Sequence, residues 1–301
     1  RETNGRFRIP LPRHEMFIDR DYRYPFVKSR RFATVMTEFG CPFHCAFCVM
    51  GTLGCKRRPI EDVIEELLSL RSLGIRDIFF LDQSFGSDRS RNLALCEAIG
   101  HTVPEMRWLC FSRVDLVDET VLSAMKSAGC HSIIFGVETA NAQLLETYRK
   151  GYSLDQVRSM FAVAQRLKIR TVATFLLGLP GETRESAMET IEFARRLPCN
   201  FASLNVAVPR MGTDLRQWAV TQGYVNESDR HFDQSGSRVI MQTESLTSAE
   251  LAEIKRIAVR RLYLNPSRIW RILISIQSWN ELLIQVREGI CLLQRFMRSR
   301  S

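Results

Sequence analysis

The sequence predicts an α/β fold: a partial (β/α)6 TIM-like barrel with a C-terminal helical extension. From Arg31 onward, short apolar runs of strand length alternate with longer segments of helical periodicity. Consecutive strand–helix units imply a parallel sheet with right-handed crossovers, and six units instead of eight imply a barrel that does not close. After about Ser245 the pattern is helical only. We therefore expect an N-terminal linker (1–30), a core barrel (31–245) and an extension (246–301).

The expected strands are short and mostly apolar, at Phe32–Thr37, Asp77–Leu81, Arg107–Phe111, Ser132–Val137, Thr171–Leu177 and Phe201–Val206. Local signals mark the helices between them. Pro59 is placed for a helix start, and Ser153 with Gln156 forms a capping box. Gly74 and Gly129 stand where helices would end before the next strand.

The extension is helical and basic. Thr247 and Glu250 form a second capping box, and Asn265-Pro266 begins a new helix. From Leu251 to Ser301 there are ten Lys or Arg against three Asp or Glu, a net +7 of the +9 carried by the whole chain. The extension is expected either to dock on the barrel as a solvated helical pair or to lie in an anionic membrane interface.

The composition indicates an intracellular protein. Nine cysteines in 301 residues, without a secretion signal, indicate a reducing compartment and not a disulfide scaffold. No run approaches the roughly 20 apolar residues needed to span a bilayer. We expect a cytoplasmic location, with peripheral contact at the inner membrane face as the alternative for the basic extension.

Three cysteines carry the chemistry. Cys41, Cys45 and Cys48 form a CxxxCxxC run directly after the first expected strand. Three thiolates can hold three irons of a cubic 4Fe-4S cluster and leave the fourth iron open, whereas electron-transfer clusters and closed zinc sites use four ligands. An iron with an open coordination site indicates a cluster that takes part in a reaction and is not structural. The alternative is a non-catalytic zinc or Fe-S scaffold protein in which Cys55 or His44 completes a closed site.

The cysteine run, with the aromatic Phe47 just before its last cysteine, resembles the signature of radical S-adenosylmethionine (SAM) enzymes. The resemblance covers the chain from about Ile9 to Phe296. It implies that SAM binds the open iron and that an electron, supplied by a donor such as flavodoxin or ferredoxin, cleaves SAM to a 5′-deoxyadenosyl radical. It also implies that Phe47 packs against the adenine of SAM, although by spacing alone this ring is equally a core side chain.

The second and fifth strands end in segments that resemble SAM-binding motifs. Asp82 and Gln83 stand where many members of the superfamily have Gly-Gly-Glu, and an anionic Asp82 would accept from the ammonium group of SAM. A helix-capping aspartate is the alternative. Gly178 and Leu179 resemble the start of a glycine-rich adenine support, in which glycine permits close backbone approach.

The third and fourth strands end in charged residues. Ser112 and Arg113 close the third strand, and the arginine would pair with the carboxylate of SAM. A structural pair of Arg113 with Asp115 or with Glu138 is the alternative. Glu138 ends a nearly all-apolar strand, where an unpaired carboxylate is costly, and its position resembles the ribose-binding site of the superfamily.

The ends of the chain resemble one branch of the superfamily, the cobalamin-associated (class B type) proteins. Residues 1–30 look like a linker that follows a cobalamin-binding domain, and the basic tail is similar to that of the same group. The domain itself is missing here, and the chain begins at Arg1 instead of a methionine. We therefore expect a fragment whose parent binds cobalamin and catalyses methylation or the modification of a ring or lipid.

The expected partner is a small-molecule or lipid-like substrate. Nucleic acid is not expected, because no RNA-binding module is recognisable in the sequence. The rival within enzymes is a tRNA-modifying radical SAM methylthiotransferase, which the basic tail would serve.

Overall fold

A six-stranded, all-parallel open sheet organises the computed structural model. The structure describes residues 4–17, 20, 22, 24, 26–29, 31–230 and 241–276, with 279, 282, 283, 286, 287 and 289 beyond them. The strand order is β2-β5-β6-β7-β8-β9. The strands are β2 (Ala33–Val35), β5 (Asp77–Phe80), β6 (Arg107–Ser112), β7 (Cys130–Glu138), β8 (Arg170–Leu177) and β9 (Phe201–Val206). This is the predicted partial barrel.

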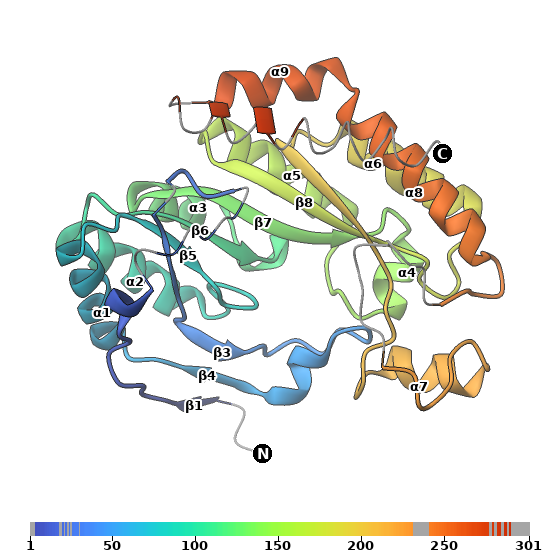
Figure 1. Cartoon of the computed structure of the whole chain (residues 1–301), viewed down its shortest axis with the longest axis horizontal. Coiled ribbons are helices and arrows are strands. Elements are labelled where there is room, and N and C mark those ends of the chain that lie inside the picture. Colours follow the sequence, from blue (N-terminus) through green and yellow to red (C-terminus); the bar gives the residue numbers. More distant parts are fainter. Residues whose placement is uncertain are drawn as a thin grey trace.

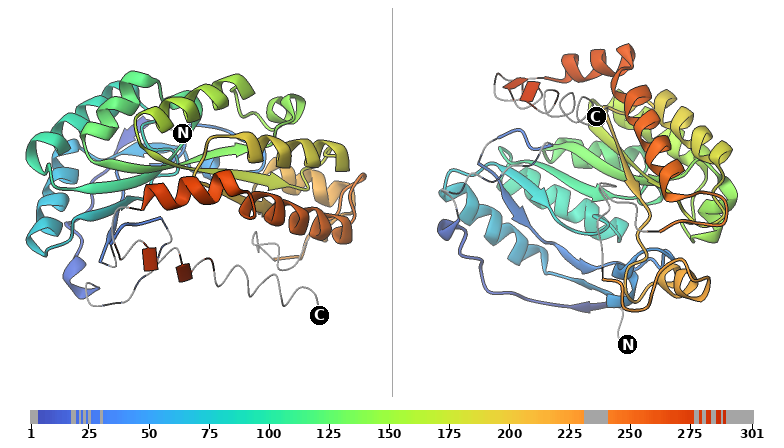
Figure 2. Two further views of the ribbon diagram at one scale, coloured as in Figure 1. Left: turned by 90° about the horizontal axis from the view of Figure 1, so that it is seen from above. Right: turned by 45° about the vertical axis from the view of Figure 1, so that its right-hand side comes forward.

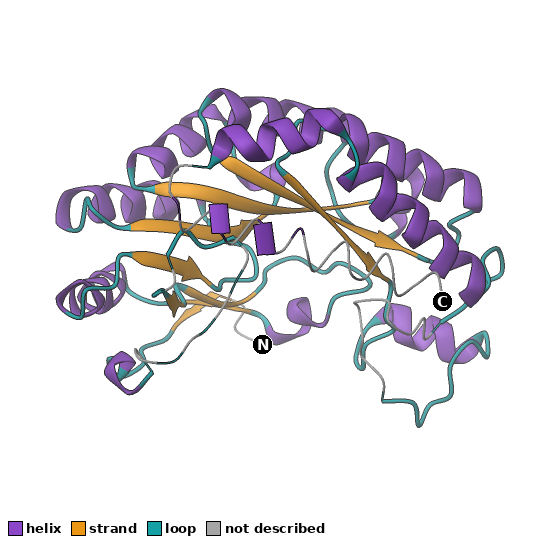
Figure 3. Cartoon of the chain, turned by 45° about the horizontal axis from the view of Figure 1, so that its top comes forward, coloured by secondary structure: helices purple, strands orange, loops and turns teal. Residues whose placement is uncertain are grey.

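Helices cover the outer face of this sheet, as Figures 1 and 2 show for α1–α3, α5, α6 and α8. Their bounds are α1 (Ile60–Ser72), α2 (Arg89–Thr102), α3 (Glu119–Ser127), α4 (Ala142–Thr147), α5 (Leu154–Arg166), α6 (Arg184–Arg196), α7 (Asp214–Thr221), α8 (Ser248–Tyr263) and α9 (Pro266–Ser275). The main core lies between helices and sheet and includes Trp108, Phe135 and Phe161. Figure 3 shows this helical layer arched over the strands.

The local helix signals are confirmed. The capping boxes of Ser153 with Gln156 and of Thr247 with Glu250 are both formed. Pro59 precedes α1 as its N-cap. Gly74 and Gly129 follow helices with φ of 75° and 93°, the left-handed conformation that ends a helix at little cost in glycine.

The inner face of the sheet carries its own aromatic cluster. Phe79, Leu109 and Ile134 point to this side and pack with residues of the N-terminal segment. Tyr24 stacks on Phe79 with ring centroids 4.7 Å apart, and Phe26 lies 5.4 Å from Phe201. Part of the expected linker therefore packs into the barrel instead of lying outside it.

A second, three-stranded sheet was not predicted. It joins β1 (Asn4–Arg6), β4 (Cys55–Arg57) and β3 (Glu38–Gly40) in the order β1-β4-β3. Its strands have three residues each, too short to show a periodic pattern in the sequence. Gly40 has a φ of 76°, and a Cβ on it would lie 1.9 Å from the carbonyl oxygen of Gly54. Only glycine therefore fits where β3 turns into the cysteine loop.

Candidate active site

The three cysteines lie on one loop between β3 and the short 3-10 helix η2 (Val49–Leu53). Backbone hydrogen bonds hold this loop. The Cys41 amide donates to the Gly54 carbonyl at 3.0 Å, and the Cys48 amide donates to the Cys45 carbonyl at 3.0 Å. Burial raises the pKa of the Cys48 thiol, and the charges of Cys45 and Cys41 raise it further. The three thiols therefore lie close enough to influence one another.

Two of the cysteines contact residues that follow different strands of the barrel, and the third feels the charge of a nearby lysine. The sulfur of Cys41 lies 3.4 Å from the Ser84 hydroxyl, in the loop after β5. Arg113, at the end of β6, donates from Nη1 to the sulfur of Cys45 at 3.5 Å. Burial raises the pKa of the Cys48 thiol, whereas the positive charge of the Lys150 ammonium lowers it. The carboxyl ends of the strands thus surround the cysteine loop, as the order of the sequence predicts.

Arg113 is held in a fixed orientation. Its Nε and Nη2 donate to the two carboxylate oxygens of Asp115 at 2.9 and 2.8 Å, and Nη2 also donates to the Lys150 carbonyl. The guanidinium lies over the Phe43 ring, 3.7 Å from its centroid. Of the two structural pairs that the sequence allowed, the structure forms the pair with Asp115. This arrangement aims the remaining nitrogen, Nη1, at the sulfur of Cys45.

Glu138 forms an ion pair with a lysine that the sequence did not single out. Its Oε1 lies 3.0 Å from Lys150 Nζ, and both side chains are buried. The pairing register of β7 shifts between Gly136 and Glu138, and Glu138 has a φ of 68°, which is rare outside glycine. A Cβ on Gly136 would lie 2.5 Å from Oε1 of Glu138. The bulge and the glycine together direct this carboxylate toward Lys150.

The Lys150 ammonium is central to the site. Burial alone would lower its pKa, but the negative charge of the Glu138 carboxylate raises it above its usual range. The ammonium also lies 5.7 Å from the centroid of the Phe47 ring. Lys150 is therefore a permanent cation that connects the predicted ribose residue, the predicted adenine residue and the cysteine loop.

The two residues expected to contact adenine belong to one apolar cluster. Leu179 is fully buried in it, and Phe47 packs against it partly exposed. The Phe47 ring lies 6.1 Å from that of Tyr148. Gly178, with a φ of 77°, starts the turn after β8, and its amide donates to Oε2 of Glu182 at 2.5 Å. The structure thus brings the cysteine loop and the glycine-rich turn together.

Glu182 makes stability depend on pH. Its Oε1 is buried without a hydrogen-bond partner, and burial raises its pKa from 4.5 to about 7. The folded state thus holds the proton more tightly than the unfolded state, so the stabilisation is full below pH 4.5 and is lost as the pH rises through about 7. We expect Glu182→Gln to remove about 2 kcal/mol of the loss in unfolding free energy between mildly acidic and mildly alkaline pH. Urea unfolding of both proteins across this range measures the difference, and parallel pH profiles would contradict it.

Asp82 and its neighbours lie on the other side of the cysteine loop. Asp82 is fully buried and accepts hydrogen bonds from the Thr37 amide and hydroxyl, both at 2.6 Å, and from the Glu38 amide at 3.0 Å. Burial raises its pKa to about 7, against these hydrogen bonds. Gln83 is exposed, and the Ser112 hydroxyl donates to the Phe85 carbonyl at 3.0 Å. Asp82 thus links the loop after β5 to the start of β3; that Asp82, Gln83 and Ser112 also contact SAM stays a prediction.

The alternative ligands are placed differently from the three cysteines. Cys55 is buried in β4, with its sulfur 4.0 Å from the Ser87 hydroxyl, and His44 is exposed. Within the described residues, no three His, Cys, Asp or Glu side chains are gathered as a metal-ion site. One zinc ion draws all its ligands to one point, whereas a cubic cluster binds each thiolate through a different iron. Metal analysis is therefore the direct test between these two kinds of site.

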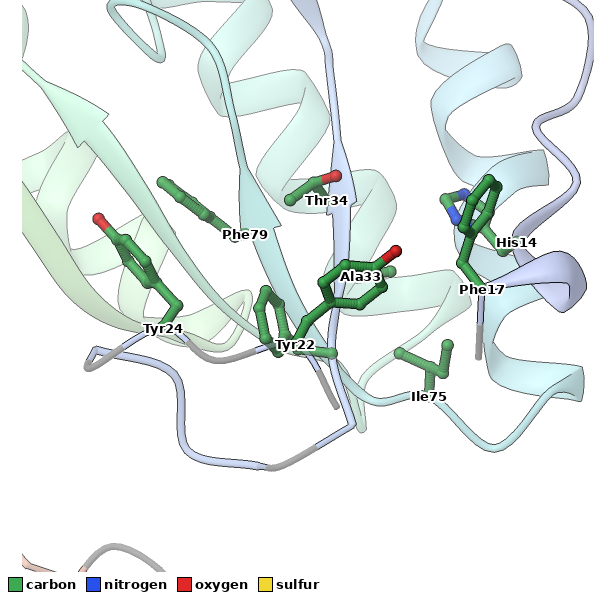
Figure 4. Close-up of a pocket in the computed structure, with 9 residues that line it drawn as sticks. His14, Phe17, Tyr22, Tyr24, Ala33, Thr34, Ile75 and Phe79 are labelled. Carbon is green, nitrogen blue, oxygen red and sulfur yellow. The ribbon is translucent and has the colours of Figure 1, made fainter. Parts of the chain in front are cut away.

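Figure 4 shows a cavity whose lining includes none of the three cysteines. It has a volume of about 440 Å³ between the N-terminal segment and strands β2 and β5, and its lining includes His14, Tyr22, Tyr24, Thr34 and Phe79. Its strand residues belong to the amino-terminal and middle parts of the sheet, whereas the cysteine loop meets the carboxyl ends. A second cavity, of about 360 Å³, lies beside the cysteine loop and is lined by Ala46, Tyr148, Gly181 and Leu215, among others.

Comparison with known proteins identifies relatives along most of the chain. The family model of the Radical SAM superfamily matches residues 37–194. An uncharacterized methyltransferase of Pyrococcus horikoshii, PH0819, is 32% identical over 263 residues, which is 86% of this chain and 56% of the relative. The cytidylyl-2-hydroxyethylphosphonate methyltransferase of Streptomyces wedmorensis is 24% identical over 79% of this chain and 46% of its own length. The tRNA-2-methylthio-N(6)-dimethylallyladenosine synthase of Thermotoga petrophila is 28% identical over 62% of this chain and 45% of its own length.

Solved structures share the fold. The radical SAM methyltransferase TsrM of Kitasatospora setae, with cobalamin and a [4Fe-4S] cluster bound, has a TM-score of 0.63 at 19% identity, over 88% of this chain and 58% of that one. OxsB, a cobalamin-dependent enzyme with aqua-cobalamin and SAM bound, has a TM-score of 0.62 at 16% identity, over 86% and 45%. This chain thus spans about half the length of the curated relatives that it matches.

Proposed function

Since this chain belongs to the radical SAM superfamily, we propose that it is the catalytic core of a cobalamin-associated methyltransferase that acts on a small organic molecule. Membership of the superfamily implies a 4Fe-4S cluster and SAM as cofactors. In this proposal Cys41, Cys45 and Cys48 hold the cluster. The observation that carries it is that the loop with these three thiols contacts the segments that follow β5 and β6, through Cys41 with Ser84 and through Cys45 with Arg113.

The residues around the loop fit a bound cluster and SAM. Three cysteines without a fourth ligand beside them suit a cluster with one open iron. Two buried cations, Arg113 and Lys150, act on the thiols of Cys45 and Cys48 and would offset the negative charge of three thiolates. When bound and reduced, the cluster supplies the electron that cleaves SAM to methionine and a 5′-deoxyadenosyl radical.

The chain's own residues would bind and orient SAM. Glu138, aimed by the bulge of β7, would accept from the ribose hydroxyls through the oxygen not paired with Lys150. Phe47 and Leu179 would enclose the adenine, because they already belong to one apolar cluster. Arg113 would fix the Cys45 side of the loop, with at most its Nη1 group left for the carboxylate of SAM.

Asp82, Gln83, Ser112 and Gly178 would contribute mainly by shaping the loops. The carboxylate of Asp82 already accepts three hydrogen bonds from Thr37 and Glu38. The Ser112 hydroxyl already has a partner in the Phe85 carbonyl. Exposed Gln83 is the member of this group whose side chain is left for the ammonium group of SAM.

The lengths of the alignments with the relatives favour methyl transfer over methylthiolation. The alignment with the Pyrococcus horikoshii methyltransferase is longer than segment 31–245, so it includes part of the linker or of the extension. The alignment with the tRNA methylthiotransferase, over 201 residues, is no longer than the core. A cobalamin domain outside this chain would provide the methyl carrier, and flavodoxin or ferredoxin the electron, in a cytoplasmic setting. All eight described cysteines are free thiols, as a reducing compartment requires.

Anaerobic reconstitution tests the proposal. We expect the chain to bind about four irons with sulfide and, with a chemical reductant and SAM, to release 5′-deoxyadenosine. Cys45→Ala should abolish this product with the fold intact, while Cys55→Ala, a buried cysteine outside the loop, should retain it. Undiminished product from Cys45→Ala would contradict the proposal.

The same preparation separates the rivals. Iron and sulfide for two clusters would favour the tRNA methylthiotransferase, whereas one zinc and no iron would favour a closed scaffold site. Loss of iron from Cys55→Ala would make Cys55 a fourth ligand, which the open-iron mechanism does not allow.

A further inference from the structure

The helix α9 packs on the protein with its apolar face turned outward. Surface helices normally turn their apolar face to the core and their charges to water. In α9, Arg268 is 1% exposed, whereas Trp270 is 64% and Ile274 is 62% exposed. Leu273 and Ile269 are also exposed. At 100° per residue these four apolar side chains share one face, opposite to that of Arg268.

Buried Arg268 and partly buried Arg271 attach α9 to α6. Nη2 of Arg268 donates to the Ala194 carbonyl at 2.6 Å, and Nη1 of Arg271 donates to the Leu197 carbonyl at 3.3 Å. Both acceptors lie at the C-terminal end of α6, where carbonyls lack helical partners and the helix dipole attracts cations. The end of α6 thus fixes α9 by its basic side, and the apolar side is left facing outward.

The exposed surface is apolar and basic. Leu264, between α8 and α9, extends the apolar face, and Arg256, Arg260 and Arg261 are exposed on α8. Beyond α9, Trp279 is 80% and Leu283 is 66% exposed. Trp and Leu flanked by Arg are typical of helices that lie in a membrane interface, where arginine meets anionic headgroups. No helix of the described residues is long and apolar enough to cross a membrane.

We propose that α9 and the adjoining arginines of α8 form a docking surface for an anionic lipid membrane. The side chains of Trp270, Leu273 and Ile274 enter the headgroup layer, and Arg256, Arg260 and Arg261 pair with lipid phosphates. A neutral protein partner would not need this cluster of positive charge, and the exposed tryptophan, leucine and isoleucines beside it suit the headgroup layer of an anionic membrane. Strand β1 lies on the side of the molecule away from α9, as Figure 1 shows. This proposal does not depend on the proposed chemistry.

Vesicle co-sedimentation tests the surface on the full chain with its cofactor loaded. We expect binding to vesicles of phosphatidylcholine with phosphatidylglycerol, and little binding to phosphatidylcholine alone. The combined change Trp270→Ser, Leu273→Ser and Ile274→Ser should weaken binding by about tenfold or more. Arg256→Gln with Arg260→Gln and Arg261→Gln should weaken it and reduce its salt dependence.

A matched control replaces exposed apolar residues elsewhere. Leu11→Ser with Met211→Ser removes side chains of 44% and 43% exposure far along the chain from α9 and should leave binding unchanged. Circular dichroism checks the fold of each variant. Absence of binding to anionic vesicles, or equal binding of the serine triple variant, would overturn the proposal. So would a dimer that the triple variant dissociates without any vesicle binding, because the occupant would then be a second copy of the chain.

Discussion

Lys150→Met is expected to destabilise the protein by about 3–5 kcal/mol, because it leaves the Glu138 carboxylate buried without its cation. The pair is short, at 3.0 Å, and both side chains are nearly excluded from water. Without the lysine, no nearby cation offsets the cost of burying the negative charge of Glu138. The destabilisation should then increase as the pH rises above the ordinary range of a glutamate. Urea unfolding at mildly acidic and at neutral pH measures both effects.

The double variant Lys150→Met with Glu138→Gln is the control for this result. It removes both charges, and we expect it to recover most of the lost stability, since no unpaired charge stays buried. Lys126→Met, which removes an exposed lysine that donates to the Lys168 carbonyl, should cost well below 1 kcal/mol. If the single and double variants at the pair were equally unstable, Lys150 would act by packing and not by charge.

Arg113→Met is expected to make the bound cluster harder to reduce. The arginine donates to the Cys45 sulfur and brings a buried positive charge to the cluster site, and both stabilise the reduced, more negative state. Their loss should lower the midpoint potential by an amount on the order of 50 mV, since about 59 mV corresponds to a tenfold change for one electron. A redox titration monitored by electron paramagnetic resonance measures this potential without relying on turnover.

Two further variants separate charge from structure. Arg113→Lys keeps the charge but not the bidentate contact with Asp115, so its potential should lie between those of the wild type and Arg113→Met. Arg158→Gln removes a charge on the surface, where Arg158 pairs with exposed Asp155, and should leave the potential unchanged. An unchanged potential in Arg113→Met, with the iron content intact, would show that the arginine only braces the loop.

Much of the site followed from strand order alone. The sequence places Cys41 and Cys45 after the first expected strand, Arg113 after the third and Glu138 at the end of the fourth, and parallel strands bring such residues to one edge of a sheet. It did not identify Lys150, which follows α4 twelve residues after Glu138 and has no motif around it. Ser84 was likewise missed, because a serine four residues beyond the end of β5 carries no signal until its contact with Cys41 is seen.

The sequence alone determined the superfamily, the six strand–helix units and several helix starts and ends, because these depend on local periodicity, caps and a short motif. Only the tertiary structure decided which charges meet: Arg113 with Asp115, Glu138 with Lys150, and Arg268 with the end of α6. The reason is physical. A local pattern fixes which face of a helix is apolar, but the partner for a buried charge is set by the whole fold. In α9 the fold buries Arg268 and leaves the apolar face exposed.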